Sequence, residues 1–373
     1  MHIALVTTSY PDAGGGSEAA GGFVADFAQA LASHARVTVV AAARSASAVT
    51  EGAVAVHRFA VPRMPLSLLR PHSPLDWPSI LTTLRSGRDA LEHLVTTDRP
   101  DFIFALWALP SGYWARSMQQ KHGVSYGTWA LGSDIWSLGR VPVIRGVLGR
   151  VIASAALSYA DGLALAGDVK RLSGRDCEFL PSARRIAPIE RAASASGAPY
   201  KLAFLGRWHR NKGVDLLLDA LQCLPEEDWV RVDEVRIFGG GPLEQTVRDA
   251  VAGLRSQARP VSVGGYLDKA AAAELIAWSD YLLLPSRIES IPVIFSDAAQ
   301  IGRPIVATPV GDLPELFHRY EFGFIAEAPD ANAYAAALQR ALRADASQFD
   351  ARLAMIAGDF DVAVTAERFA RSA

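Results

Sequence analysis

Residues 281–297 of the 373-residue chain have the sequence YLLLPSRIESIPVIFSD. The first four residues are apolar and predict a short buried strand, and Pro292 suits the first position of a helix over residues 293–300. The loop between them carries Glu289, Ser290 and Ile291. A strand that passes through a polar loop into a helix is the repeating unit of a parallel sheet covered by helices. This segment therefore predicts an α/β fold.

The same alternation of strands and helices recurs along the chain. Predicted strands are residues 3–7, 36–41, 102–106, 124–129, 200–205, 234–238, 261–263, 281–284 and 304–307. Predicted helices are residues 23–33, 112–122, 214–224, 243–256, 269–278 and 293–300. The strands are almost continuously apolar, which is typical of parallel sheets buried on both faces. The pattern predicts doubly wound sheets along the whole chain.

The length of the chain predicts two domains, because a single hydrophobic core stops growing at roughly 250–300 residues. Residues 191–199, RAASASGAP, are small and aperiodic, as in a linker. We therefore predict an N-terminal domain over residues 1–190 and a C-terminal domain over 200–350. A C-terminal helix over 351–373 is expected to pack back on the first domain. Two such domains would face a central cleft, because open α/β sheets bind ligands at their strand ends.

The composition excludes several classes of protein. There are 37 Lys and Arg against 39 Asp and Glu, so no basic excess indicates a nucleic-acid partner. Cys177 and Cys223 are far apart in the sequence and predict neither a disulfide framework nor a zinc site. The first apolar run is too short for a signal peptide, and no stretch reaches the roughly 20 apolar residues of a membrane-spanning helix. We expect a cytoplasmic protein, with contact to the inner face of the membrane as a further hypothesis.

Two cations follow the strand predicted over residues 200–205. Arg207 and Lys212 lie in the loop that leads to the next helix, at the carboxyl end of the strand. A planar guanidinium and a point-charge ammonium together suit a diphosphate. The alternative is a solvated basic loop without a specific ligand.

Glycines are concentrated in two loops that also connect a strand to a helix. Gly21 and Gly22 end the first loop, residues 10–22, and Gly240 and Gly241 lie in FGGGPL at residues 238–243. Without side chains, these positions let the backbone come close to a phosphate or a base. The alternatives are a flexible surface turn for the first loop and a tight turn that requires positive φ for the second.

Two carboxylates in the decisive segment are candidate sugar ligands. Glu289 is placed in the loop after a strand, and Asp297 falls inside the following helix. Carboxylates accept pairs of hydrogen bonds from neighbouring hydroxyls, which sugars and ribose both offer. The alternative is that Glu289 caps the helix and Asp297 is a surface charge.

Taken in order, these motifs resemble glycosyltransferase family 4. The residues that carry the resemblance are Gly206-Arg207, Lys212-Gly213, Gly239-Gly240-Gly241-Pro242, Pro285-Ser286, Glu289, Pro292, Asp297, Gly302-Arg303-Pro304 and Pro314-Glu315. The N-terminal half matches more loosely, in Ser9-Tyr10-Pro11, Gly21-Gly22-Phe23-Val24, Trp107-Ala108-Leu109-Pro110 and Gly132-Ser133-Asp134. The resemblance implies the GT-B fold, in which two doubly wound Rossmann-like domains face a central cleft.

The resemblance also implies roles for these residues. Arg207 and Lys212 would stabilise a departing diphosphate, Glu289 would bind the donor sugar, and Asp297 the ribose. Gly21, Gly22, Gly240, Gly241, Ser290, Ile291 and Pro292 complete the expected donor-binding set. The expected reaction is retaining transfer from a UDP- or GDP-linked sugar to a glycan or lipid-linked acceptor, as in polysaccharide biosynthesis, with no metal or other cofactor.

Leu131 and Asp297 depart from the family pattern. Leu131 stands where the family often has a histidine, which leaves the backbone or Asp134 to serve at the reacting centre. Asp134 is therefore counted with Arg207, Lys212 and Glu289 among the expected catalytic residues. The two departures favour an alternative function, a non-catalytic GT-B protein that binds a nucleotide sugar or glycan as a partner subunit. An epimerase or a phosphorylase is a third class, without positive support in these residues.

Basic and apolar residues are interleaved in two segments of the first half. The first has Arg58, Arg63 and Arg70 among Met64, Leu66, Leu68, Leu69 and Trp77, and the second has Arg140, Arg145 and Arg150 in an apolar run. Such mixtures bind anionic bilayers. The alternative is a solvated helix face or ordinary core packing.

Overall fold

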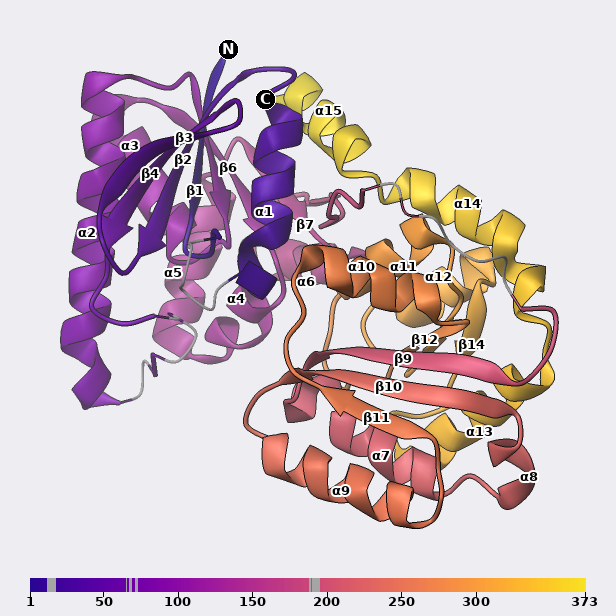
Figure 1. The fold of residues 1–373 in the computed structure, drawn as a ribbon. Coiled ribbons are helices and arrows are strands. Elements are labelled where there is room, and N and C mark those ends of the chain that lie inside the picture. Colours follow the sequence, from indigo (N-terminus) through magenta and orange to yellow (C-terminus); the bar gives the residue numbers. More distant parts are fainter. Residues whose placement is uncertain (12–17, 65, 67–68, 71–72, 188, 190–194) are drawn as a thin grey trace. The chain divides into compact units, whose positions relative to one another are not determined.

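The computed structural model describes residues 1–11, 18–64, 66, 69–70, 73–187, 189 and 195–373. The chain forms two compact units (Figure 1). Unit 1 comprises Met1–Arg184 and Val362–Ala373, and unit 2 comprises Arg185–Asp361. Part of the predicted linker, residues 191–194, and Leu68 of the first basic segment lie outside the described residues. Each unit is an α/β domain with a doubly wound sheet, so the predicted fold class is confirmed.

Unit 1 is built on an eight-stranded sheet with the order β3-β4-β2-β1-β5-β6-β7-β8. Its strands are β1 (His2–Thr7), β2 (Arg36–Ala43), β3 (Ser47–Glu51), β4 (Val54–Ala60), β5 (Phe102–Leu106), β6 (Ser125–Ala130), β7 (Leu157–Ala160) and β8 (Glu178–Phe179). β1 is central and buried along its whole length, and Ile3 pairs in register with Val37 and Phe102. The edge strand β3 runs antiparallel to β4 and is mostly exposed, which the sequence did not predict.

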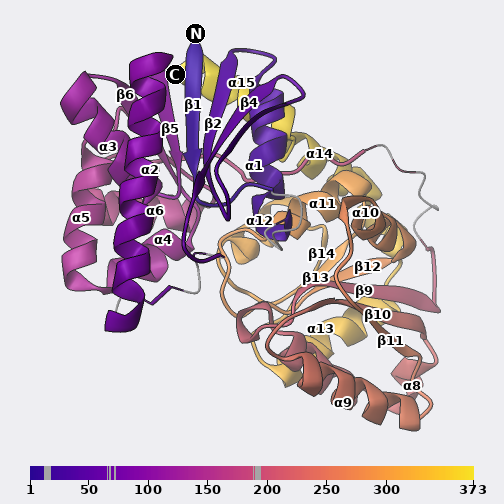
Figure 2. The same cartoon turned by 60° about the vertical axis from the view of Figure 1, so that its left-hand side comes forward.

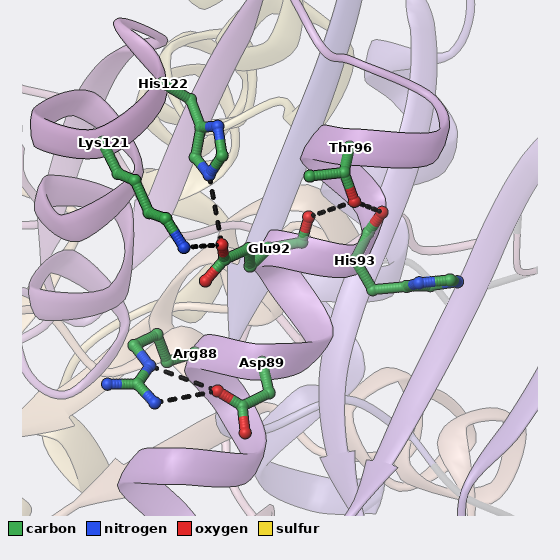
Figure 3. Close-up of polar contacts among 7 residues, drawn as sticks. All are labelled: Arg88, Asp89, Glu92, His93, Thr96, Lys121 and His122. Carbon is green, nitrogen blue, oxygen red and sulfur yellow. Dashed lines mark hydrogen bonds and ion pairs between the residues drawn. The ribbon is translucent and has the colours of Figure 1, made fainter.

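Helices cover both faces of this sheet (Figures 1 and 2). They are α1 (Glu18–Leu31), α2 (Trp77–Thr97), α3 (Ser111–His122), α4 (Ser133–Trp136), α5 (Pro142–Ala153), α6 (Leu163–Ser173) and α15 (Val362–Ser372). α2 packs closely on α3, because Gly87 leaves room for the Trp114 ring, and the Trp114 indole donates to the Leu84 carbonyl over 2.9 Å. Nearer the other end of α2, Glu92 pairs with Lys121 and His122 of α3 (Figure 3). The hydrogen bond from Lys121 lowers the pKa of Glu92.

The last helix completes the core of unit 1. Phe369 of α15 stacks on Phe104 with ring centroids 4.0 Å apart, and its ring also contacts those of Phe27 and Tyr159. The preceding helix, α14 (Asp350–Asp359), belongs to unit 2, where the Phe360 ring that follows it packs edge-on against Phe295. Residues 351–373 were predicted as one helical segment. The chain instead forms two helices there, because aromatic contacts hold them in different cores.

Unit 2 contains a six-stranded parallel sheet with the order β11-β10-β9-β12-β13-β14. Its strands are β9 (Tyr200–Arg207), β10 (Val232–Gly240), β11 (Val261–Gly264), β12 (Tyr281–Leu284), β13 (Ile305–Ala307) and β14 (Gly323–Ile325). The helices are α7 (Val214–Gln222), α8 (Glu226–Trp229), α9 (Glu244–Ser256), α10 (Lys269–Trp278), α11 (Val293–Ile301), α12 (Leu313–Tyr320), α13 (Ala331–Arg343) and α14. Every strand predicted in this half is present within a few residues.

Candidate functional site

The strand order of unit 2 defines a switch point between β9 and β12. The chain winds from β9 outward to β10 and β11, and then returns to β12 on the other side of β9. The connection after β9 therefore leads toward β10, and the connection after β12 leads the opposite way along the sheet, toward β13. Open α/β sheets bind ligands at this place, beyond the carboxyl ends of the strands. Both loops carry predicted site residues.

These two loops are fastened to each other. The Arg287 backbone N–H donates to the Asn211 carbonyl over 2.8 Å, and the Arg287 guanidinium donates to Asp215 over 2.7 Å. Gly213 has φ 69°, and a Cβ there would lie 1.8 Å from the Pro285 carbonyl oxygen. A glycine is thus required both by the backbone conformation and by the contact. The loops hold one fixed geometry at the switch point.

Lys212 and Glu289 meet at this junction. The Lys212 ammonium donates a hydrogen bond to the Glu289 carboxylate, and both side chains are partly exposed. The pair presents a cation and an acceptor side by side, which is the combination that a phosphate joined to a sugar needs. Two residues predicted independently are therefore brought together.

Ser290 adds a buried polar group to this junction. Its hydroxyl is buried, and among the described residues it has no hydrogen-bond partner. A buried hydroxyl left unpaired costs about 1–3 kcal/mol, so such groups in folded proteins usually have a partner. Asp312 donates its backbone N–H to the Ser290 carbonyl over 3.2 Å, which fixes the loop but leaves the hydroxyl unused. The hydroxyl is free to bind a ligand.

The other predicted site residues of the 281–297 segment, Ile291, Pro292 and Asp297, are buried. α11 begins at Val293, as predicted, and Pro292 is its N-cap, where the sequence predicted the first helical position. Ile291 and Pro292 are both buried beside the loop. Asp297 is fully buried within α11, so the alternative that it is a surface charge is wrong.

Arg207 lies at the last position of β9 and is exposed. In the strand register it pairs with Gly240, so the predicted cation and the glycine turn are neighbours at one edge of the sheet. Packing requires a glycine at position 241. A Cβ there would lie 2.8 Å from the Trp208 carbonyl oxygen, and Gly241 has φ 145°. The tight-turn explanation therefore holds for Gly241, and the turn still leaves bare backbone beside Arg207.

Tyr266 is a site neighbour that the sequence analysis missed. Its exposed ring lies against Gly240, and its hydroxyl donates to the Gly240 carbonyl over 2.7 Å. The available signal was an aromatic residue directly after two glycines, Gly264, which ends β11, and Gly265, which follows it.

Unit 1 has its own switch point, between β1 and β5. The loop after β1 includes residues 12–17, which lie outside the described residues, so only its ends can be placed. A Cβ on Gly21 would lie 2.8 Å from the Tyr10 backbone, whereas Gly22 has room, with Arg184 Cδ at 3.8 Å. Gly21 is therefore required for α1 to pack against the end of this loop.

Asp134 holds two loops of unit 1 together. Its carboxylate accepts hydrogen bonds from the backbone N–H groups of Ala108 over 2.6 Å, Leu131 over 3.2 Å and Ile135 over 3.1 Å. Burial raises its pKa to about 6. These contacts make Asp134 a positioning residue for the loops after β5 and β6. Its predicted role at the reacting centre stays a prediction.

Solved structures share this architecture over the whole chain. Sucrose-phosphate synthase from Thermosynechococcus elongatus superposes with a TM-score of 0.74 at 17% identity, covering 100% of this chain and 98% of that one. HepE from Anabaena, solved with UDP and glucose, gives 0.68 at 16% identity, covering 100% and 99%. The chain has the GT-B fold, with two Rossmann-like domains.

Sequence comparison finds similarity over the second domain. Residues 199–344 match the model of the family described as Glycosyl transferases group 1. A D-inositol 3-phosphate glycosyltransferase from Corynebacterium aurimucosum is 31% identical over 173 residues, which are 45% of this chain and 41% of that protein. The first curated relatives match over 34% to 56% of their own lengths. The family match therefore covers most of unit 2, which carries Lys212 and Glu289.

None of the helices in the described part of the chain combines the length and hydropathy needed to cross a bilayer.

Proposed function

We propose that this chain transfers a sugar from a nucleoside-diphosphate sugar to an acceptor hydroxyl. The observation that carries the proposal is the Lys212–Glu289 pair at the switch point of unit 2, with Arg207 on the adjoining strand end. The family match over residues 199–344 and the glycosyltransferase name of the relative support the reaction class. HepE, a protein of the same fold, was solved with UDP, which makes a uridine nucleotide the first donor to test and a guanosine nucleotide the second.

In this proposal the cations act on the leaving group. The bond between the anomeric carbon and the β-phosphate oxygen breaks, a bond to the acceptor oxygen forms, and the acceptor hydroxyl releases its proton. Arg207 and Lys212 offset the negative charge that develops on the diphosphate, which is the largest electrostatic demand of the step. With two cations in place, the transfer proceeds without a metal or another cofactor.

The carboxylates and the loop bind the sugars. Glu289 and the Ser290 hydroxyl contact hydroxyls of the transferred sugar. Asp297 is the proposed ribose acceptor, which requires α11 to expose a side chain that is buried without ligand. The backbone of Gly21, Gly22, Gly240 and Gly241 approaches the phosphates. The transfer retains the anomeric configuration, as the family 4 resemblance implies, and the acceptor is a glycan or a lipid-linked saccharide.

Calorimetric titration with UDP, GDP and ADP tests the donor site. We expect one nucleotide to bind, and the Arg207→Ala and Lys212→Met variants each to weaken it about 10- to 100-fold, the loss of a charge-assisted hydrogen bond. Arg248→Ala removes an exposed cation of α9 and is the matched control. No binding of any nucleotide, or an equal loss in the control, contradicts the proposal. Turnover that persists unchanged in EDTA supports metal independence, and its abolition rules it out.

A non-catalytic GT-B subunit is the second candidate, and Leu131 is the observation that favours it. The Leu131 side chain cannot donate a hydrogen bond, and its backbone N–H is used by Asp134. One assay distinguishes the transferase from the non-catalytic subunit. It measures release of nucleoside diphosphate from the donor in the presence of extracted glycans and lipid-linked saccharides. Turnover supports the transferase, and tight nucleotide binding without turnover supports the subunit.

A further inference from the structure

We propose that one end of unit 1 docks on the surface of an anionic phospholipid bilayer. The first part of this surface is the start of α2 and the turn before it. Leu75 is 90% exposed, Trp77 54% and Leu81 51%, although all three are large and apolar. Trp77 and Leu81 are four residues apart on α2, so they lie on the same face of the helix. We call Leu75, Trp77 and Leu81 the α2 patch.

The second part is the start of α5. Val143 is 80% exposed and Val141 42%, and Pro142 between them is exposed as well. Arg140 and Arg145 flank these residues and are also exposed. We call Val141, Pro142 and Val143 the α5 patch.

Both patches lie at the same end of unit 1. α2 follows β4 and α5 follows β6, and helices that follow the strands of a parallel sheet begin at the carboxyl edge of that sheet. The two views of the fold show both helices starting at this edge (Figures 1 and 2). Leu66, just before α2, and Val147 of α5 pack against the same core cluster. The patches can therefore face one flat surface together.

Arginines accompany both patches along the sequence of unit 1. The whole chain has a formal charge of -2, but residues 135–160 contain Arg140, Arg145 and Arg150 and no Asp or Glu. Residues 61–85 contain three arginines and a single acidic residue, Asp76, which pairs with Arg63 over 3.3 Å. Farther along α2, Arg88 pairs with Asp89. Short apolar groups among arginines suit the bilayer interface, because the apolar groups enter the headgroup boundary while the arginines pair with lipid phosphates. Tryptophan is also enriched at that depth.

The charge also argues against a second copy of the chain as the occupant. A two-fold dimer through this end would bring the same surface of each copy together, and so arginines against arginines. Like charges in contact repel, whereas an anionic lipid surface complements them. This proposal does not depend on the transfer reaction, because it concerns binding without any nucleotide.

Vesicle flotation of the full chain tests the proposal directly. The probes are vesicles of phosphatidylcholine with and without phosphatidylglycerol. We expect the protein to float with the anionic vesicles and to remain behind with the neutral ones. In about 1 M NaCl, where the Debye length falls to about 3 Å, the binding should be lost. Equal binding to both kinds of vesicle, or none to the anionic kind at low salt, overturns the proposal.

Variants then locate the surface. Arg140→Gln with Arg145→Gln should weaken the partition coefficient by at least about tenfold, and Leu75→Ser with Trp77→Ser by a similar factor. Val230→Ser is the matched apolar control, because Val230 is 74% exposed but belongs to unit 2. Circular dichroism and thermal melting confirm that each variant is folded. An equal loss in the Val230 control, or a dimer in light scattering that the Trp77 variant abolishes, overturns bilayer docking.

Discussion

The Lys212 ammonium and the Glu289 carboxylate form an ion pair across 77 residues of sequence, between the loops that follow β9 and β12. Either residue alone would be an ordinary surface charge. Their pairing at the switch point places a cation for the phosphate next to an acceptor for the sugar.

Two single substitutions separate the two roles. Lys212→Met should weaken nucleoside-diphosphate binding about 10- to 100-fold, because it removes a charge-assisted contact. Glu289→Gln should leave this binding nearly unchanged and lower turnover of the donor sugar at least about 100-fold, because its contact forms with the transferred sugar. Calorimetry and initial rates measure the two effects. If Glu289→Gln weakens the bare nucleotide as much as Lys212→Met does, the division of roles is wrong.

Gly213→Ala should separate the two site loops. The left-handed backbone costs a side chain roughly 1–2 kcal/mol, and the Cβ would collide with the Pro285 carbonyl. We expect the free energy of unfolding to fall by more than about 2 kcal/mol, and nucleotide affinity to fall as well. Gly253→Ala in α9 is the control, since its Cβ meets nothing within 4 Å, and it should stabilise by up to about 1 kcal/mol. Urea denaturation measures the free energy of unfolding of both variants. Equal changes in the two variants would exclude a collision with Pro285 as the cause.

Asp134 should make stability depend on pH. Burial raises its pKa from 3.8 to about 6, so the folded protein holds this proton more tightly than the unfolded chain. The contribution is fully present below about pH 4 and is lost as the pH rises through about 6. The difference in unfolding free energy between the wild type and Asp134→Asn should fall by up to about 3 kcal/mol over this range. Urea denaturation at a series of pH values measures it, and a constant difference contradicts the assignment.

Phe369→Ala should destabilise unit 1 strongly. The substitution removes a ring that stacks on Phe104 and contacts Phe27, and burying such a ring contributes about 3–5 kcal/mol. Val364→Ala, on the exposed face of the same helix, should change stability by no more than about 0.5 kcal/mol. Differential scanning calorimetry distinguishes them. Similar melting temperatures for the two variants would show that α15 does not complete this core.

Much of the fold follows from the sequence pattern, because buried parallel strands are short, apolar and flanked by loops. β12 was predicted with its bounds unchanged at Tyr281–Leu284. The long helix α2 was not predicted, because its buried face includes Thr83 and Gly87, which give no apolar periodicity. The antiparallel strand β3 was missed for a similar reason, since an exposed edge strand needs few apolar residues.

The sequence predicted which residues belong to the candidate site, but it did not predict the contacts between them. Strand ends indicate which side chains lie at the carboxyl edge of a sheet, so Arg207, Lys212 and Glu289 could be selected. The pairing of Lys212 with Glu289 depends on which strands are neighbours, and the sequence does not contain that order. The unpaired Ser290 hydroxyl and the contact of Tyr266 with Gly240 depend on side-chain packing, which a pattern of residue types does not resolve.

The position of Phe369 also sets an order of assembly during translation. The ribosome synthesises residues 185–361, the whole of unit 2, before it reaches the helix that carries this ring. Domains usually fold in the order in which they are synthesised. Until α15 is made, the Phe104 ring of the first domain lacks its stacking partner Phe369, although the second domain already has all its residues. Closure of the first domain therefore follows synthesis of the second, when α15 returns to a sheet that was made first.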